Sequence, residues 1–412
     1  MLTKIFGDAG VSFGGKSVIL SGDFAQLPPP GRGQYPLYSD SVGTMTSGVK
    51  PYQATSIMGK ALWQQFTTVV ILRQNMRQRG ISEEDQQFRS ALENMRYRAC
   101  TPQDIAVLES RIAGSSCLAP SLLDANFREI SIITSYNLDR DAMNEEGAER
   151  FAREHHRVLH HFHSIDQWPS ASSESTSLRQ SQWDHSILQP DNATAIADAT
   201  QQFLWTLPPH CTSNHAGILP LCIGMPVLLK VNEATELCAT NGAEATVVGW
   251  TSHTRSGRHV LDVLFVLLKA PARPVNLPSL PPNVIPLTRR RVRLAWTSGK
   301  SGRSIKWDRE QISVLLNFAM TDFGSQGRTR PFNPCHLMNC RTHQSIYTCL
   351  SRSSSLQGTL IIGSLDHSKI TGGRIGPLRR KFRELEILRL ALSNSGRSGR
   401  EPTMFRLAFM RL

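Results

Sequence analysis

The stretch Phe13-Gly-Gly-Lys-Ser-Val-Ile-Leu-Ser-Gly-Asp-Phe-Ala-Gln-Leu-Pro-Pro29 decides the fold. Its apolar centre, Ser17–Leu20, predicts a short buried strand that a Ser-Gly-Asp turn and a run of prolines bring to an end. In open α/β sheets, ligands bind beyond the carboxyl ends of the strands. Asp23 and Gln26 occupy that position, where they could detect a terminal phosphate. The alternative is that Asp23 only caps a turn.

Beyond this stretch, helical and strand patterns alternate, which predicts an α/β protein. Helical spacing of apolar residues covers 57–66, 84–94, 102–113 and 139–154, and strands are expected at 67–72 and 130–134. Thr101 followed by Pro102 is typical of a helix start. From 223 to 268 the chain becomes β-rich, with Asn241-Gly242 as a hairpin signal. A small β subdomain inside a larger α/β body fits this order.

Composition limits the class of protein. The chain has 412 residues with 46 Lys+Arg against 33 Asp+Glu, which is a net charge of +13, and 40% hydrophobic residues. It is therefore long enough for two or three domains with real cores. The eight cysteines are scattered, as expected for a reducing compartment. We expect neither a membrane span, which needs roughly 18 apolar residues, nor a secretion signal.

The positive charge is concentrated in two segments. Residues 287–310 hold eight Lys/Arg and two acids, and residues 373–412 hold ten Lys/Arg and three acids. Such clusters favour a polyanionic partner, most commonly nucleic acid. A solvated basic face and a basic tail are the equally acceptable alternative.

Residues Gly10–Ser17 match the phosphate-loop pattern G-x-x-x-x-G-K-[ST]. A working phosphate loop follows a strand and opens a helix, whose first N–H groups hold the phosphates. Here Lys16 is followed by the Val-Ile-Leu strand instead of a helix. We therefore expect no nucleotide cradle at this position.

Six segments in one order resemble a known family, the superfamily 1 DNA helicases of the petite-integration-frequency (PIF) type, including those of Helitron transposons. The opening stretch is similar to the third motif of that family, and Asn75-Met76-Arg77 to the next. The remaining similar segments are 132–137 with Asn144, Gly224–Val227 with Asn232 and Asn241-Gly242, Ala319–Thr329, and Tyr347–Ser353.

The resemblance implies a role for individual residues. Gln26, Arg77 and Arg352 would be catalytic, with Gln26 sensing the γ-phosphate of ATP and the two arginines contacting it when two RecA-like domains close. The nucleotide-binding set would be Asp23, Gln26, Arg77, Gly327 and Arg352, and the DNA-binding set Asn137, Thr321, Gln326 and Thr329. Without the motif order, surface ion pairs and a polar turn would explain these side chains.

The resemblance also implies an architecture of RecA-like P-loop NTPase domains with a small β-rich inserted subdomain. The first RecA-like domain would be an incomplete remnant, because the family places its Walker A and Walker B segments upstream of the third motif, so we expect an amino-terminally truncated helicase. The expected bounds are 1–120 for this domain, 121–245 and 305–390 for the second with a disordered insertion at 164–200, 246–304 for the β subdomain, and 391–412 for a basic tail.

Two functions follow from these expectations. The first is an ATP- and Mg²⁺-dependent helicase on single-stranded or forked DNA, in the nucleus or the mitochondrion, with work in genome maintenance or transposition. The second is a transposon-derived remnant that binds nucleic acid without hydrolysing ATP. The family often has Lys where Gly324 stands, although Arg328 is close enough in the sequence to substitute.

Three weaker constellations are assigned to structure and not to chemistry. Histidines 155, 156, 160, 161 and 163 lie on an expected helix without a completed set of metal ligands, so no metal site is expected. Cys335 and Cys340, with two nearby histidines, are spaced too irregularly for a zinc module. Trp205, Trp250 and Trp307 are expected in cores more than in base stacking.

Overall fold

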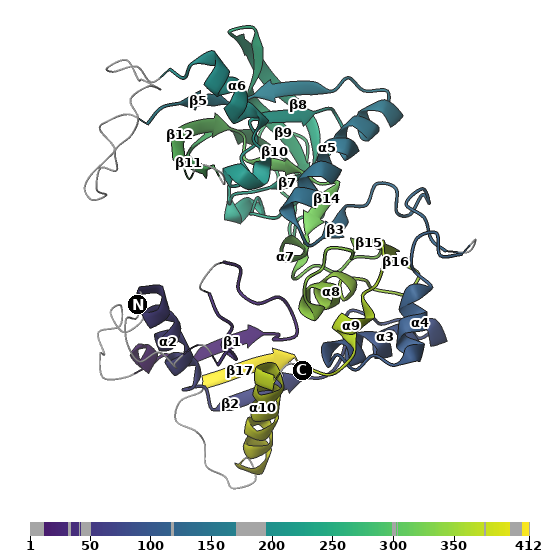
Figure 1. The fold of residues 1–412 in the computed structure, drawn as a ribbon. Helices are drawn as coiled ribbons and strands as arrows, with labels where there is room; N and C mark the ends of the chain where they lie inside the picture. The colour runs from purple at the N-terminus through teal and green to yellow at the C-terminus, as the bar shows by residue number, and fades with distance from the viewer. Residues whose placement is uncertain are drawn as a thin grey trace. The chain divides into compact units, whose positions relative to one another are not determined.

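The computed structural model forms two compact units, which are considered separately (Figure 1). Residues 1–135 and 325–412 make the first unit, and residues 136–324 make the second. The residues that the structure describes are 12–31, 34–40, 42, 51–116, 119–169, 195–298, 302, 304–374, 376–395 and 406–411. Gly10 and Val11 of the phosphate-loop pattern and residues 170–194 of the expected insertion lie outside this range.

A parallel sheet of the first unit contains the strand predicted from the opening stretch. Its members are β1 (Val18–Gly22), β2 (Thr68–Leu72) and β17 (Arg406–Arg411), in the order β1-β17-β2. The prediction of a basic tail over 391–412 was wrong, because β17 is the middle strand and α10 (Gly376–Ser395) covers the start of that segment.

Three helices of the first unit overlap the predicted helices. They are α2 (Pro51–Trp63), α3 (Glu83–Arg96) and α4 (Pro102–Glu109). Ser82 caps α3, and Thr101 forms a capping box with Asp104 at α4, where Pro102 takes the first helical position. In α3, Phe88, Ala91, Leu92 and Met95 recur every three or four residues and are buried.

Three short parallel strands of the first unit belong to a second sheet. They are β3 (Ile132–Thr134), β15 (Asn333–His336) and β16 (Thr359–Ile362), with β15 between the other two. Helix α8 (His343–Leu350) follows β15, is capped by Thr342, and has all eight residues buried. The short helix α9 (His367–Ile370) comes after β16. Parallel strands joined through a buried helix are the α/β arrangement that the sequence predicted.

The second unit begins with α5 (Asn137–Glu154) and is otherwise mainly antiparallel β structure. Its main sheet has the order β10-β9-β8-β7-β13, and its strands are β7 (Pro226–Leu229), β8 (Glu244–Arg255), β9 (Arg258–Leu268), β10 (Val284–Thr288) and β13 (Val314–Leu316). Strands β7 and β8 pair as the Asn241-Gly242 signal predicted. The β-rich region therefore extends beyond the expected 246–304.

A smaller sheet of the second unit has its own core. Strands β11 (Arg290–Thr297), β12 (Ser304–Gln311) and β5 (Ile165–Gln167) lie in that order, with α6 (Asp198–Thr206) packed through Leu204. Trp307 is fully buried in this core, as predicted. The other strands of the unit are β4 (His160–His163) paired with β6 (Ile218–Leu221), and β14 (Ala319–Thr321), which precedes α7 (Asp322–Ser325).

The expected helical histidine cluster was wrong in its secondary structure. His155 ends α5, His156 has a left-handed φ of 52°, and His160–His163 form strand β4. Alternation along a strand sends neighbouring histidines to opposite faces, so helical pairs at a spacing of four do not form.

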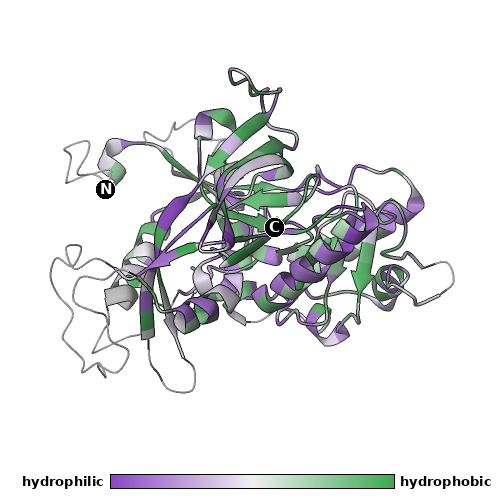
Figure 2. Ribbon diagram, turned by 90° about the horizontal axis from the view of Figure 1, so that it is seen from above, coloured by the Kyte–Doolittle hydropathy of each residue, from purple (hydrophilic) through white to green (hydrophobic). Residues whose placement is uncertain are grey.

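In Figure 2 several strands are green, the colour of hydrophobic residues, over much of their length, whereas the helices alternate between green and the purple of hydrophilic residues. This matches the buried faces of the sheets and the amphipathic character of the helices. Among the described residues, no helix is both long and apolar enough to span a bilayer.

Candidate functional site

A tight turn follows β1 in the first unit and carries Asp23 and Gln26. The Asp23 carboxylate accepts a hydrogen bond from the Ala25 N–H at 2.9 Å, and the Gln26 N–H donates to the Asp23 carbonyl at 3.1 Å. The Gln26 side-chain amide also donates to the Asp23 carboxylate at 3.3 Å. Asp23 therefore caps the turn, as the simpler interpretation had it, and also orients Gln26.

The same carboxylate forms a buried ion pair. The Arg96 guanidinium, at the end of α3, donates to both oxygens of Asp23 at 2.7 and 2.9 Å and to the Tyr347 hydroxyl at 2.6 Å. The exposed fraction is 0% for the Arg96 side chain and 7% for Asp23. Burial alone would lower the pKa of Arg96, but the Asp23 charge and the Tyr347 hydroxyl outweigh burial and raise it. Arg96 is therefore a permanent cation held by two partners.

Arg77 links two segments that the sequence separates by more than 250 residues. Its Nε donates to the Thr329 hydroxyl at 2.9 Å, and its Nη1 donates to the Ser351 carbonyl at 2.7 Å. Asn75 holds the Arg77 backbone in place by accepting its N–H at 3.0 Å. One predicted phosphate contact, Arg77, thus lies against one predicted DNA contact, Thr329.

Arg352 is buried without a carboxylate partner. Its side chain donates to the Thr348 carbonyl at 3.0 Å and the Ser351 hydroxyl at 2.9 Å, and 1% of the residue is exposed. Within the part of the chain that the structure describes, Arg352 makes no ion pair. Burial, followed by repulsion from Arg77, lowers its pKa to about 10. A buried cation of this kind is well suited to an anionic ligand, since an anion would compensate its charge.

The structure brings only some of the predicted site residues together. Asp23, Gln26, Arg77, Thr329 and Arg352 all lie in the first unit. Gln326 and Gly327 lie there too and are exposed, and Gly327 has a φ of 79°, which favours glycine. The two remaining residues, Asn137 at the exposed start of α5 and Thr321 at the end of β14, belong to the second unit.

The Lys16 loop lacks the geometry of a phosphate cradle. Ser12–Gly15 form a short 3₁₀ turn in which Phe13, Gly14 and Gly15 have left-handed φ values of 59°, 62° and 72°. Strand β1, and not a helix, follows Lys16. The described part of the pattern therefore offers no row of helix N-terminal N–H groups to a phosphate.

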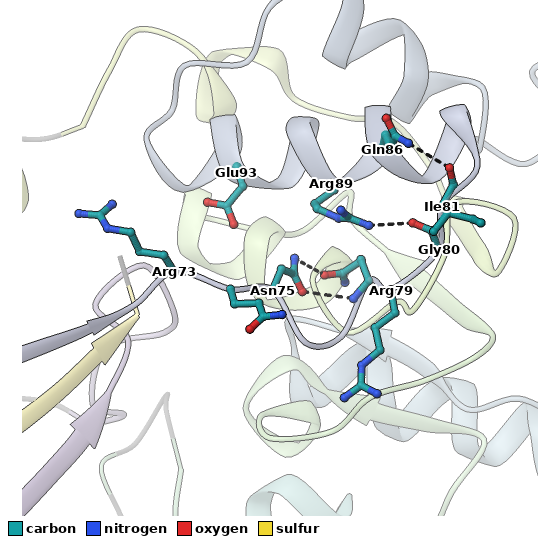
Figure 3. Close-up of a pocket in the computed structure, with 10 residues that line it drawn as sticks. Arg73, Asn75, Arg79, Gly80, Ile81, Gln86, Arg89 and Glu93 are labelled. Carbon is teal, nitrogen blue, oxygen red and sulfur yellow. Dashed lines mark hydrogen bonds between the residues drawn. The ribbon is translucent and has the colours of Figure 1, made fainter.

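A cavity of about 460 Å³ lies beside the Arg77 turn (Figure 3). The turn is closed by the Asn75 amide, which donates to Gln78 at 2.7 Å, while the Gln78 side chain donates to the Ser353 carbonyl. On the other wall, Arg89 donates to the Gly80 carbonyl at 2.8 Å. The cavity is lined by polar groups and does not include Gln26, Arg77 or Arg352, so it is separate from the predicted phosphate contacts.

The basic segment 287–310 is largely compensated by acids. Five of its eight cations form ion pairs: Arg289 with Asp262 and Glu310, Arg290 with Glu233, Arg291 with Glu310, Arg293 with Asp308, and Arg309 with Asp166. Lys300 and Arg303 lie outside the described residues. Charge counted along the sequence therefore overstates the positive charge that this segment presents to a polyanion.

Among the residues described, no group of three or more His, Cys, Asp or Glu side chains is arranged to hold a metal ion. Cys335 is fully buried in β15, and burial raises the pKa of its thiol to about 12.

Asn144 accepts hydrogen bonds from the Phe318 and Ala319 N–H groups at 2.9 and 2.8 Å, and it fixes α5 to the segment that enters β14.

Solved structures with a similar fold include Pif1 helicases. The chain superposes on the Pif1 helicase from Candida albicans with a TM-score of 0.55, 16% identity, and coverage of 89% of this chain and 67% of that chain. For Bacteroides Pif1 bound to ssDNA the TM-score is 0.55 and the identity 15%, with coverage of 96% of this chain and 71% of that chain. For Bacteroides Pif1 in complex with ADP-AlF3 and ssDNA the TM-score is 0.56 and the identity 16%, with the same two coverages, 96% and 71%. No protein-family model and no curated protein matches the chain.

The sheets and helices define a mixed α/β protein. More particularly, the chain has the fold of the Pif1 helicases, as the resemblance implied.

Three functional candidates were missed at the sequence level. Arg96 ends a helix with no motif around it, Gln344 lies between two recognised segments, and Tyr347 stands inside a recognised segment without an assigned role. Only the tertiary structure brings them to Asp23 and Phe24. No periodicity or spacing in the sequence could have predicted those contacts.

Proposed function

We propose that this chain is an ATP-dependent DNA helicase of the PIF type, in which a bound nucleotide phosphate controls the grip on single-stranded DNA. The single observation that supports this most is the buried Arg352. It is repelled by Arg77, forms no ion pair among the described residues, and feels the Asp23 charge less strongly than burial and that repulsion. A terminal phosphate would supply the missing negative charge.

The donor set suits the phosphate end of a nucleotide. Arg352 and Arg77 would hold the terminal phosphate, and the Gln26 amide, oriented by Asp23, would contact it or the attacking water. When bound with Mg²⁺, ATP supplies a terminal phosphate whose cleavage releases free energy. The Ser12–Lys16 turn does not fit the remaining phosphates, so no contact of Lys16 with the nucleotide is included.

The chain's own hydrogen bonds suggest how binding of the phosphate would affect binding of the DNA. Arg77 donates at once to Thr329 and to the Ser351 carbonyl next to Arg352. If Arg77 turns its Nε toward a phosphate, Thr329 loses the hydrogen bond that it accepts. The Thr329 side chain, no longer held by that bond, could then reorient its O–H toward a phosphodiester oxygen of single-stranded DNA.

One observation favours a second function, nucleic-acid binding without hydrolysis. The left-handed Phe13–Gly15 turn leads into a strand, which is the wrong geometry for a phosphate cradle. Hydrolysis relies on positioning and on electrostatic stabilisation of the phosphates, and each contributes orders of magnitude in rate. A protein that keeps Arg77 and Arg352 without a cradle would bind DNA and hydrolyse ATP slowly or not at all.

ATP turnover separates the two functions. The purified chain is assayed for phosphate release with and without single-stranded DNA, together with the Arg352→Ala and Lys16→Ala variants. A helicase shows turnover that DNA stimulates, that Arg352→Ala lowers at least tenfold and that Lys16→Ala leaves unchanged. No turnover, combined with DNA binding that weakens as salt rises, supports the second function. Turnover abolished by Lys16→Ala would contradict the account of the Ser12–Lys16 turn.

A further inference from the structure

Arg96 connects three segments that are distant in the sequence. It belongs to α3, its carboxylate partner Asp23 to the turn after β1, and its hydroxyl partner Tyr347 to α8. Two parallel bonds join the guanidinium to the carboxylate, and a third goes to the hydroxyl. Three donors at fixed angles match these acceptors, which the single ammonium of a lysine does not reproduce.

On the turn side, the Arg96 contact bears on Gln26. The Asp23 oxygen that receives Arg96 Nη1 also receives the Gln26 amide, and the other oxygen receives the Ala25 N–H. The orientation of the carboxylate therefore sets both the turn and the Gln26 side chain. A carboxylate freed from Arg96 would be able to rotate and take Gln26 with it.

On the helix side, the contact bears on Arg352. One turn before Tyr347, the Gln344 amide donates to the Phe24 carbonyl at 3.1 Å, so α8 touches the turn after β1 at a second point. Beyond Tyr347, Arg352 rests on the end of the helix through the Thr348 carbonyl. A shift of the turn along α8 would therefore displace Arg352.

We propose that Arg96 is a positioning residue that holds the Gln26 turn and the Arg352 helix in one arrangement. A phosphate bound at either of them would therefore change the position of the other. The inference rests on the proposed function for the identity of the ligand. Its mechanical part, the transmission between Tyr347 and the turn through Arg96, does not depend on that ligand. A purely structural ion pair would stabilise the unit without making Gln26 depend on the Tyr347 hydroxyl.

The mechanical part is tested by amide hydrogen exchange on the full chain without ligand. Tyr347→Phe removes one hydroxyl, and Arg96→Lys keeps the charge but loses the two-pronged contact. Both are expected to speed exchange of the Ala25 and Gln26 amides at least fivefold. The matched controls are Tyr35→Phe, a partly exposed tyrosine, and Arg98→Lys, whose side chain donates to the Ser368 and Lys369 carbonyls. Faster exchange confined to 343–352 would overturn the proposal.

The functional part is tested by the effect of nucleotide on DNA affinity. Binding of a fluorescent oligo-thymidine is measured with and without Mg·ADP and aluminium fluoride. In Arg96→Lys we expect nucleotide to leave the affinity for DNA unchanged, and we expect the affinity for DNA without nucleotide to equal that of the parent. A full nucleotide effect in that variant would overturn the proposal. If the parent chain shows no nucleotide effect, the proposed function fails, and the exchange experiment still decides whether Arg96 transmits.

Discussion

Two buried arginines of this chain should respond in opposite ways to the same substitution. Arg309, in β12, is 0% exposed and donates to both oxygens of Asp166 at 2.8 and 2.7 Å. Arg352 is 1% exposed, and its side chain bonds to a carbonyl and a hydroxyl and to no carboxylate among the residues described. Replacing each by methionine preserves most of the apolar volume and removes the charge. Arg309→Met leaves behind a buried carboxylate and the His215 and Leu204 carbonyls to which Arg309 also donates, whereas Arg352→Met leaves behind no carboxylate that it bonded.

The expected magnitudes follow from these partners. Arg309→Met leaves the Asp166 carboxylate buried and unpaired, which costs about 3 to 5 kcal/mol. For Arg352, the lowering of the pKa from its usual 12.5 to about 10 corresponds to about 3 kcal/mol of unfavourable burial of charge. Losing its two hydrogen bonds costs about 1 kcal/mol each. Arg352→Met should therefore leave the free energy of unfolding unchanged or raise it by about 1 kcal/mol.

Equilibrium unfolding in urea, followed by circular dichroism and by tryptophan fluorescence, measures both differences. Arg255→Met serves as the control, because Arg255 is exposed at the end of β8 and its loss should change stability by about 0.5 kcal/mol or less. Equal losses in Arg309→Met and Arg352→Met would refute the reasoning, since it assigns the difference to the carboxylate. A stable Arg352→Met variant is also the cleanest one for testing function, because any lost response to nucleotide cannot come from unfolding.

Burial, reinforced by the charges of Arg98 and Arg374, lowers the pKa of His343 to about 4. The contribution of the neutral His343 to the free energy of unfolding is therefore fully present above about pH 6.5, and about 2 kcal/mol of it is lost at pH 5. His343→Gln should flatten this acid loss in a pH series of urea unfolding, and an unchanged slope would count against it. Gly147→Ala, normally favourable in a helix, should cost about 1 to 3 kcal/mol because its Cβ would lie 2.5 Å from Phe318 Cγ; Gly59→Ala, with open space around it, is the thermal-unfolding control and should not destabilise.

Much of the fold was predictable because local signals were strong. Thr101 and Pro102 predicted the start of α4, and the apolar Val-Ile-Leu run predicted β1. The prediction failed where charge dominated the composition, as in β17, and where closely spaced histidines suggested a helix in place of β4. In both places tertiary pairing with neighbouring strands decided the structure, and such pairing leaves no trace in local spacing.

The candidate site was predictable in its parts but not in its connections. Motif order identified Gln26, Arg77 and Arg352, and the first unit contains all three. What the order could not provide is the chain of contacts from Asp23 through Arg96 to Tyr347, which depends on side-chain reach across three elements. Nor could it show that most arginines of 287–310 have acid partners, because several of those acids are distant in sequence.

The central claim is that a phosphate bound at Arg77 and Arg352 alters the hold on single-stranded DNA. The most direct measurement is the dissociation constant of an oligo-thymidine for the intact chain, with and without Mg·ADP and aluminium fluoride, at one salt concentration, for the parent and for Arg352→Met. We predict a change of at least fivefold with nucleotide in the parent and none in the variant. Equal dissociation constants with and without nucleotide in the parent would contradict the claim.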